Sequence, residues 1–211
     1  MTPARKGAIR AADIPADVLH ALSRGQMQSA TLAECLALDQ AMLVRTVFPG
    51  LSASALKAVD TACALGVLKR MARIGAVLLD ELGTDGIAQC QSHAADTVRG
   101  WACFMIGAQP ALDLQARLTS IRPLADDAHF GVREWAWLAI RGAIVAEPLR
   151  ALELLAPWTA EASPFLRRFA SEATRPRGVW CAHVAALRAD PRPGLAVLEP
   201  LRADPERYVQ D

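Results

Sequence analysis

Aromatic residues make up only 5% of this 211-residue sequence, and runs of valine, isoleucine or threonine are few. These are the residues that favour β-strands, whereas alanine and leucine, which recur throughout the chain, favour helices. The length suits one domain or a short stack of helical repeats that share a continuous core. The composition therefore predicts an all-α fold.

Metal and cofactor chemistry has little support in the sequence. The five cysteines are odd in number and widely spaced, without a Cys-x-x-Cys pair, and the four histidines lack the spacing of metal ligands or of a nucleophile-activating group. Gly83 to Gly86 predicts a turn between helices rather than a Gly-rich phosphate loop. We therefore expect no metal, no cofactor and no disulfide framework, as in a reducing cytoplasm.

Membrane-spanning and secretory segments are also missing. No stretch of about eighteen uninterrupted apolar residues occurs, and the basic segment 1–12 lacks the apolar core of a signal peptide. We expect a cytoplasmic protein without a membrane partner, most simply a monomer. Residues 1–12 are predicted to form a flexible arm and residues 13–211 a single domain.

The near-neutral net charge of +1 conceals one basic region. Between Ala162 and Arg188 the chain carries five arginines against one acidic residue, Glu172. Arginine outnumbers lysine throughout, and its planar guanidinium suits bidentate phosphate contacts, although genome base composition produces the same bias. The arginine excess alone therefore carries little functional weight.

Glycine, proline and aspartate punctuate the chain and divide it into short helices. The predicted helices are Asp13 or Pro15 to Arg24, Thr31–Phe48, Ser52–Leu65, Val67–Leu82, Ala94–Ile106, Leu112–Asp126, Gly131–Val145, Pro148–Thr159, Pro164–Thr174, Val179–Leu187 and Gly194–Leu201.

A five-residue pattern of an apolar residue, arginine, any residue, an aromatic residue and alanine occurs three times. The copies are Val98 to Ala102, Val132 to Ala136 and Leu166 to Ala170, and each starts 34 residues after the previous one. Equal periods of this length predict an α-solenoid of paired antiparallel helices, with Trp101, Trp135 and Phe169 at one core position. Another copy begins at Tyr208, so we expect a solenoid cut short at the C-terminus.

The helix Pro164–Thr174 carries the best candidate for chemistry. Arg168, Glu172 and Arg175 stand at i−4, i and i+3, on a different face from the apolar stripe, so that two guanidiniums flank one carboxylate. The alternative is a solvated salt-bridge ladder without further function. Beyond Pro176, the loop with Arg177 and Trp180 suits phosphate oxygens with an aromatic ring close by.

On the helix Gly131–Val145, Trp137 lies outside the core register, beside Glu134 and Arg141. Its ring could stack on a base or a cationic ligand, or it could fill a groove between repeats. Both interpretations stay open from the sequence.

The stretch Ala170 to Trp180 resembles the Ala-Ser-Glu…Arg-Pro-Arg signature of the AlkC-like branch of the DNA alkylation repair family. Leu198 to Pro205 and Tyr208-Val209 also resemble that family, so the likeness covers roughly Ala94 to Asp211. The resemblance implies HEAT-like repeats that grip duplex DNA. It further implies a DNA glycosylase that excises cationic N-alkylated purines such as 3-methyladenine without a metal or organic cofactor.

The resemblance also assigns residues. Glu172 matches the family's catalytic carboxylate, and Arg175 and Arg177 match its basic loop near the lesion. The full set of predicted DNA-binding residues is Arg168, Arg175, Arg177, Arg133 and Arg141, and the base-stacking candidates are Trp137 and Trp180.

Two other functions remain compatible with the sequence. One is a non-catalytic HEAT-repeat module that binds DNA or protein, motivated by the interrupted last repeat and the near-neutral charge. The other is a scaffold that binds only proteins. Salt-sensitive duplex binding without base release would support the DNA-binding form of the module.

Overall fold

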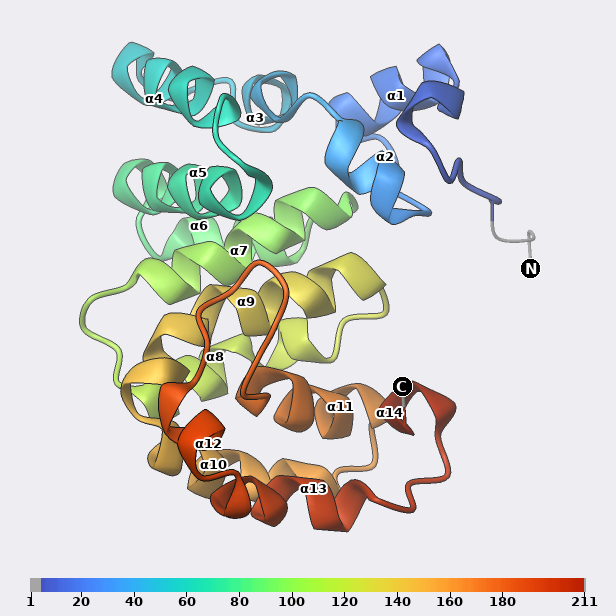
Figure 1. Cartoon of the computed structure of the whole chain (residues 1–211). Coiled ribbons are helices and arrows are strands. Elements are labelled where there is room, and N and C mark those ends of the chain that lie inside the picture. The colour runs from blue at the N-terminus through green and yellow to red at the C-terminus, as the bar shows by residue number, and fades with distance from the viewer. Residues whose placement is uncertain (1–4, 211) are drawn as a thin grey trace. The chain divides into compact units, whose positions relative to one another are not determined.

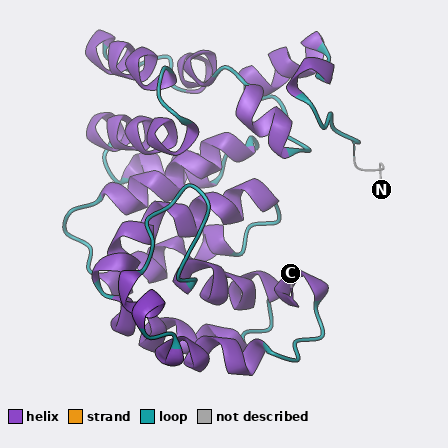
Figure 2. Cartoon of the chain, viewed as in Figure 1, coloured by secondary structure: helices purple, strands orange, loops and turns teal. Residues whose placement is uncertain are grey.

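The computed structural model describes residues 5–210, and these residues form helices and loops without a strand (Figures 1 and 2). The all-α prediction is confirmed. By their internal contacts, the described residues form two compact units, which divide between Ala108 and Gln109. Within the described residues, no helix combines the length and the apolarity that a membrane span requires. The single-domain boundary predicted from the sequence stays a prediction.

The first unit is built around α5, which packs against α4 and α7, while α6 packs against α7. Gly75 permits the close crossing of α5 and α7, because a Cβ atom at this position would lie 2.6 Å from Phe104 Cβ. The helices are α1 Ala16–Ser23, α2 Leu32–Ala37, α3 Gln40–Val47, α4 Ala53–Cys63, α5 Val67–Leu82, α6 Asp85–Gln91 and α7 Asp96–Ala108.

The second unit is a stack of helix pairs. Helices α9, α11 and α14 follow one another in contact, and α8, α10 and α13 cover them (Figure 1). Two 3₁₀ segments, Ala156–Ala160 and Arg192–Gly194, complete the turns. The helices are α8 Leu114–Ala125, α9 Phe130–Ala146, α10 Pro148–Leu155, α11 Pro164–Thr174, α12 Ala185–Ala189, α13 Leu195–Leu201 and α14 Arg207–Gln210.

The recurring arginine of the 34-residue pattern has the same structural role in every copy. Arg99, Arg133 and Arg167 each donate from Nη1 to the two carbonyls five and six residues earlier, at 2.7 to 3.0 Å. Each arginine thus ties its helix to the turn before it. The aromatic residue of every copy is buried, as predicted: Trp101, Trp135 and Phe169 are at most 3% exposed.

We expect Arg133→Leu to lower the free energy of unfolding by about 2–4 kcal/mol, because it leaves two turn carbonyls without their charged donor. It also removes the Nε bond to the Tyr208 hydroxyl (2.9 Å) and the guanidinium packed over the Phe165 ring. Urea denaturation measures the loss. Arg150→Leu is the control, since Arg150 pairs with Glu153 in solvent and its loss should cost about 0.5 kcal/mol at most. Equal losses in both variants would contradict the structural role.

Several predicted segments differ from the structure, among them Pro148–Thr159, where α10 ends at Leu155 and a 3₁₀ segment follows. The predicted helix Thr31–Phe48 is two helices, because Leu38 is extended and the Asp39 carboxylate caps α3 by accepting from Met42 N at 2.9 Å. The predicted turn at Gly83–Gly86 is shorter than expected, since α6 begins at Asp85. Of the predicted helix Val179–Leu187, only the end belongs to a helix, α12, because the preceding residues form a loop.

The N-terminal arm also differs from its prediction as a flexible segment. From Arg5 onward it is bound to α2: Arg5 donates to both Glu34 carboxylate oxygens, at 2.7 and 2.5 Å, and Ala8 N donates to the same group. Thr31 donates its hydroxyl to Ala8 O. Glu34 is fully buried, so the arm supplies a charge partner that the carboxylate requires. The part of the prediction that concerns residues 1–4 lies outside the described residues.

This contact predicts a pH-dependent contribution to stability. The hydrogen bonds from Arg5 lower the pKa of Glu34 from its ordinary 4.5 to about 2. Because the folded-state value is the lower one, the contribution is complete above pH 4.5 and is lost as the pH falls towards 2. We expect Glu34→Gln to cost about 2–3 kcal/mol at pH 7 and to flatten this dependence, as measured by denaturation at several pH values. Glu153→Gln, at an exposed position, is the control; identical pH profiles for wild type and Glu34→Gln would refute the argument.

Candidate active site

Glu172 lies in the last turn of α11 between two arginines. Its Oε1 is 3.5 Å from Arg168 Nη2 and its Oε2 is 3.1 Å from Arg175 Nη1. Glu172 is only 7% exposed, whereas Arg175 reaches solvent. The triad predicted from helical spacing is therefore present, and it holds one nearly dry carboxylate at a fixed position beside an exposed cation.

The carboxylate opens onto a cleft of about 420 Å³ between α11, α13 and α14. Arg168 and Arg175 supply cationic lining, and Leu198, Leu201 and Val209 supply an apolar wall. A volume of this size is in the usual range for small-molecule sites. The cleft can accept a group of about the size of a nucleoside against an oriented negative charge.

A second carboxylate lies behind Glu172. Glu134 on α9 lines the same small void as Glu172 and Arg168, and it accepts a hydrogen bond from Trp137 Nε1 at 3.0 Å. Burial raises the pKa of Glu134, and the negative charge of Glu172 raises it further. Two neighbouring carboxylates in unequal surroundings are a common arrangement at catalytic sites. From the sequence, Glu134 was predicted only as a neighbour of Trp137, because nothing local indicates that α9 and α11 bring the two acids together.

Arg168 is mostly covered, in contrast to its predicted role on a DNA-binding surface. Its guanidinium packs over the Tyr208 ring, 5.2 Å from the ring centre, and its side chain is 18% exposed. Its buried Nε has no hydrogen-bond partner within residues 5–210. Arg168 therefore supports Glu172 from the protein side.

Arg141 holds the loop that follows α11. Its guanidinium donates to three backbone carbonyls, those of Ala173 (2.6 Å), Arg175 (2.6 Å) and Ala182 (2.9 Å). Val184 N also donates to Pro176 O, which closes the loop at its base. Arg141 is 2% exposed, and burial lowers the pKa of its guanidinium. The structure thus differs from the prediction that Arg141 contacts DNA: its donors all serve the loop.

Arg133 differs from its predicted role for the same reason. It is 8% exposed, and its donors serve the turn before α9 and the Tyr208 hydroxyl. Both arginines were assigned to DNA because a sequence shows the charge of a guanidinium but not the carbonyls around it.

The two base-stacking candidates occupy opposite environments. Trp180 is 52% exposed at the tip of the loop, beside the exposed Val179. Its φ of 63° lies in the left-handed region, which is costly for a bulky residue and is most often retained at functional positions. Trp137 is only 5% exposed and lies beneath the loop, where a Cβ atom at Gly178 would be 3.7 Å from its ring. Only Trp180 presents its ring to solvent; Trp137 matches the groove-filling alternative.

The structure thus gathers Glu172, Arg168 and Arg175 in one cleft, with Arg177 and Trp180 on the adjoining loop. Among residues 5–210, no group of three histidine, cysteine, aspartate or glutamate side chains could hold a metal ion. The chemistry available is that of an oriented carboxylate between a covered arginine, Arg168, and an exposed one, Arg175.

Comparison with solved structures gives a clear match. The structure of the Pseudomonas fluorescens alkylpurine DNA glycosylase AlkC, bound to DNA containing an abasic site analog, aligns with 92% of this chain at a TM-score of 0.62 and 22% sequence identity. The chain has the fold of AlkC. The resemblance drawn from the sequence is thereby confirmed for the fold, and it extends beyond the C-terminal half from which it was inferred.

Three further findings bear on what the AlkC fold implies. This chain spans only half of the AlkC chain. The Bacillus subtilis (strain 168) protein YhaZ, itself described as uncharacterized, is 32% identical over 91 residues, which are 43% of this chain and 25% of YhaZ. No family model matches the sequence. The AlkC fold is therefore established here by structure, and activity is a separate question.

Proposed function

We propose that this protein is a DNA glycosylase that excises cationic N-alkylated purines of the 3-methyladenine class from duplex DNA, with Glu172 as its catalytic carboxylate. The observation that carries the proposal is a buried, doubly paired carboxylate that opens onto a cleft beside an exposed basic loop. It occurs on the fold of a protein whose structure was solved with abasic DNA.

The arrangement suits the reaction. An alkylated purine carries a positive charge, so the bond between its nitrogen and the sugar C1′ breaks with both electrons leaving on a neutral base. The sugar then carries the positive charge, and a fixed carboxylate in a largely desolvated site stabilises it. Water adds its oxygen to C1′ and gives up one proton. In this proposal Glu172 orients that water and receives the proton.

Glu134 completes the electrostatics of the proposed site. Because burial and the neighbouring Glu172 both raise its pKa, Glu134 takes up a proton more readily than an ordinary glutamate. Glu134 lies behind Glu172 and does not line the cleft, so Glu172 is the one acidic residue among those that line it. The indole N–H of Trp137 fixes the Glu134 carboxyl in place.

The direct test is incubation of the purified chain with methylated duplex DNA, followed by chromatographic identification of the released bases. Release of 3-methyladenine above the spontaneous rate supports the proposal. A second candidate is a non-catalytic DNA-binding module, favoured by the exposed arginines of the loop after α11, which could bind DNA without any chemistry at Glu172. Salt-sensitive duplex binding without base release would select it. A third outcome would indicate a protein-binding scaffold. The chain would then show no duplex affinity at low salt, and the double variant Arg175→Ala with Arg177→Ala would behave like the wild type in this binding assay.

A further inference from the structure

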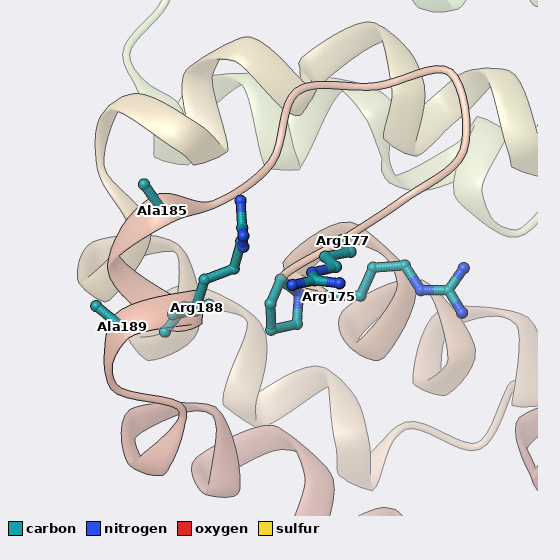
Figure 3. A pocket seen from close by; sticks show the side chains of 7 residues that line it. Arg175, Arg177, Ala185, Arg188 and Ala189 are labelled. Atoms are coloured by element: carbon teal, nitrogen blue, oxygen red, sulfur yellow. The ribbon is translucent and has the colours of Figure 1, made fainter.

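A second cleft lies on the other side of the loop base. It has a volume of about 780 Å³ and runs between the loop after α11 and the short helix α12. Arg175 and Arg177 line it from the loop and Arg188 from α12, and the remaining lining is Pro176 and small or apolar residues (Figure 3). No carboxylate is among the lining residues.

Of the three arginines that line this cleft, Arg175 pairs with Glu172, and the other two lack an acidic partner among the described residues. Within residues 5–210, neither Arg177 nor Arg188 forms an ion pair, and the one polar contact of the Arg188 side chain is a long 3.5 Å approach to His183 Nδ1. Other exposed arginines of this unit are paired: Arg192 with Asp190, for example, and Arg150 with Glu153. A concave surface that lacks acidic side chains and carries unpaired guanidiniums is suited to an oxyanion, above all to a phosphate.

The position of this cleft relative to Glu172 is fixed by one residue. Arg175 lines both clefts, and its guanidinium bonds to Glu172 while its backbone carbonyl is held by Arg141. The adjoining Pro176 carbonyl is held by Val184 N. The two clefts therefore adjoin at Arg175, so that groups bound in them would be neighbours.

We infer that the cleft of Arg177 and Arg188 binds the DNA backbone phosphate next to the nucleotide whose sugar faces Glu172. This inference deepens the proposed function and rests on it. Phosphate contacts position a protein on a duplex without reading sequence. A phosphate held here would set the register that brings one sugar to the carboxylate.

The experiment uses binding rather than catalysis. A duplex with one abasic analog carries a neutral methylphosphonate in place of a single phosphate, scanned across the positions around the analog. We expect Arg177→Ala and Arg188→Ala each to weaken binding of the unmodified duplex by about 5- to 10-fold and to lower its log–log salt slope by about one. At one position, the methylphosphonate should weaken binding of the wild-type protein by a similar factor. With the duplex modified at that position, the two variants should bind no more weakly than the wild type. Arg192→Ala, at a paired exposed arginine, is the matched control.

The inference would be overturned if the affinity losses from the arginine variants and from the methylphosphonate added up at every position. It would also be overturned if the two variants bound the duplex as tightly as Arg192→Ala does. Displacement of the duplex by inorganic phosphate at the same concentration as the duplex would also overturn it, since the cleft would then be a site for the free anion. Because no step requires base release, a chain that shows the position-specific effect without glycosylase activity would refute the proposed chemistry while keeping the phosphate site. Base release without a position-specific effect would support the proposed chemistry and refute the phosphate site.

Discussion

Glu172→Gln is expected to slow release of 3-methyladenine by at least about 100-fold, the usual scale for loss of a preorganised charge facing a developing one. Glutamine has nearly the same shape, so the packing of α11 is retained while the negative charge is removed. Arg168 and Arg175 then lose their counter-ion. Duplex affinity should therefore stay the same or rise slightly, because the surface becomes more positive.

Single-turnover release with enzyme in excess measures the chemical step, and a separate titration with abasic duplex measures affinity. Glu199→Gln is the matched control, since Glu199 lies exposed on α13 and pairs with Arg202 at 3.6 Å. A thermal melt shows whether each variant is folded. Unchanged release by Glu172→Gln would remove the carboxylate from the chemistry, and a parallel loss of affinity would make it a binding residue.

The parts of the site that are local in sequence were predictable. Helix α11 has the predicted bounds Pro164–Thr174, because Ser163 caps it, Pro164 suits the first turn and Pro176 prevents its continuation. Once the helix is placed, Arg168, Glu172 and Arg175 must share a face. The pairing of Glu172 with Arg168 follows from helix geometry, and the spacing also places Arg175, the residue that ends α11, within reach of the carboxylate.

The parts that depend on distant contacts were not predictable in this way. Arg141 is buried because its partners lie 32 to 41 residues later in the chain. Glu134 meets Glu172 only because α9 packs on α11. For Arg133 the sequence did contain a signal. An arginine recurs beside the core aromatic residue in each copy of the 34-residue pattern, and such a repeat indicates a structural role shared by all copies rather than a DNA contact.

The loop after α11 shows the limit of helix propensity. Ala182, Ala185 and Leu187 favour a helix, and one was predicted from Val179. The segment instead leaves α11 as a loop whose carbonyls are satisfied by Arg141 rather than by helical N–H groups. A side chain from another helix thereby replaces the backbone bonds that would have extended α12.

This loop gives the second large effect: Arg141→Lys is expected to lower base release by about 10- to 100-fold although Arg141 contacts neither cleft. Lysine keeps the positive charge but has a single nitrogen, which cannot bridge the carbonyls of Ala173, Arg175 and Ala182. The base of the loop should loosen, and Arg175 should lose its fixed position beside Glu172. Arg150→Lys, at an exposed position in the same unit, is the control.

Limited trypsin digestion gives a readout that active-site chemistry does not affect. Cleavage after Arg177 should accelerate by about 10-fold or more in Arg141→Lys, since local opening exposes the loop, and it should not change in Glu172→Gln. Arg141→Lys should also weaken binding to abasic duplex, because Arg175 and Arg177 are displaced together, whereas Glu172→Gln should not. If Arg141→Lys released 3-methyladenine at the wild-type rate while its loop was cleaved rapidly, an ordered loop would be unnecessary for the chemistry. Glu172 would then act without the fixed position of Arg175.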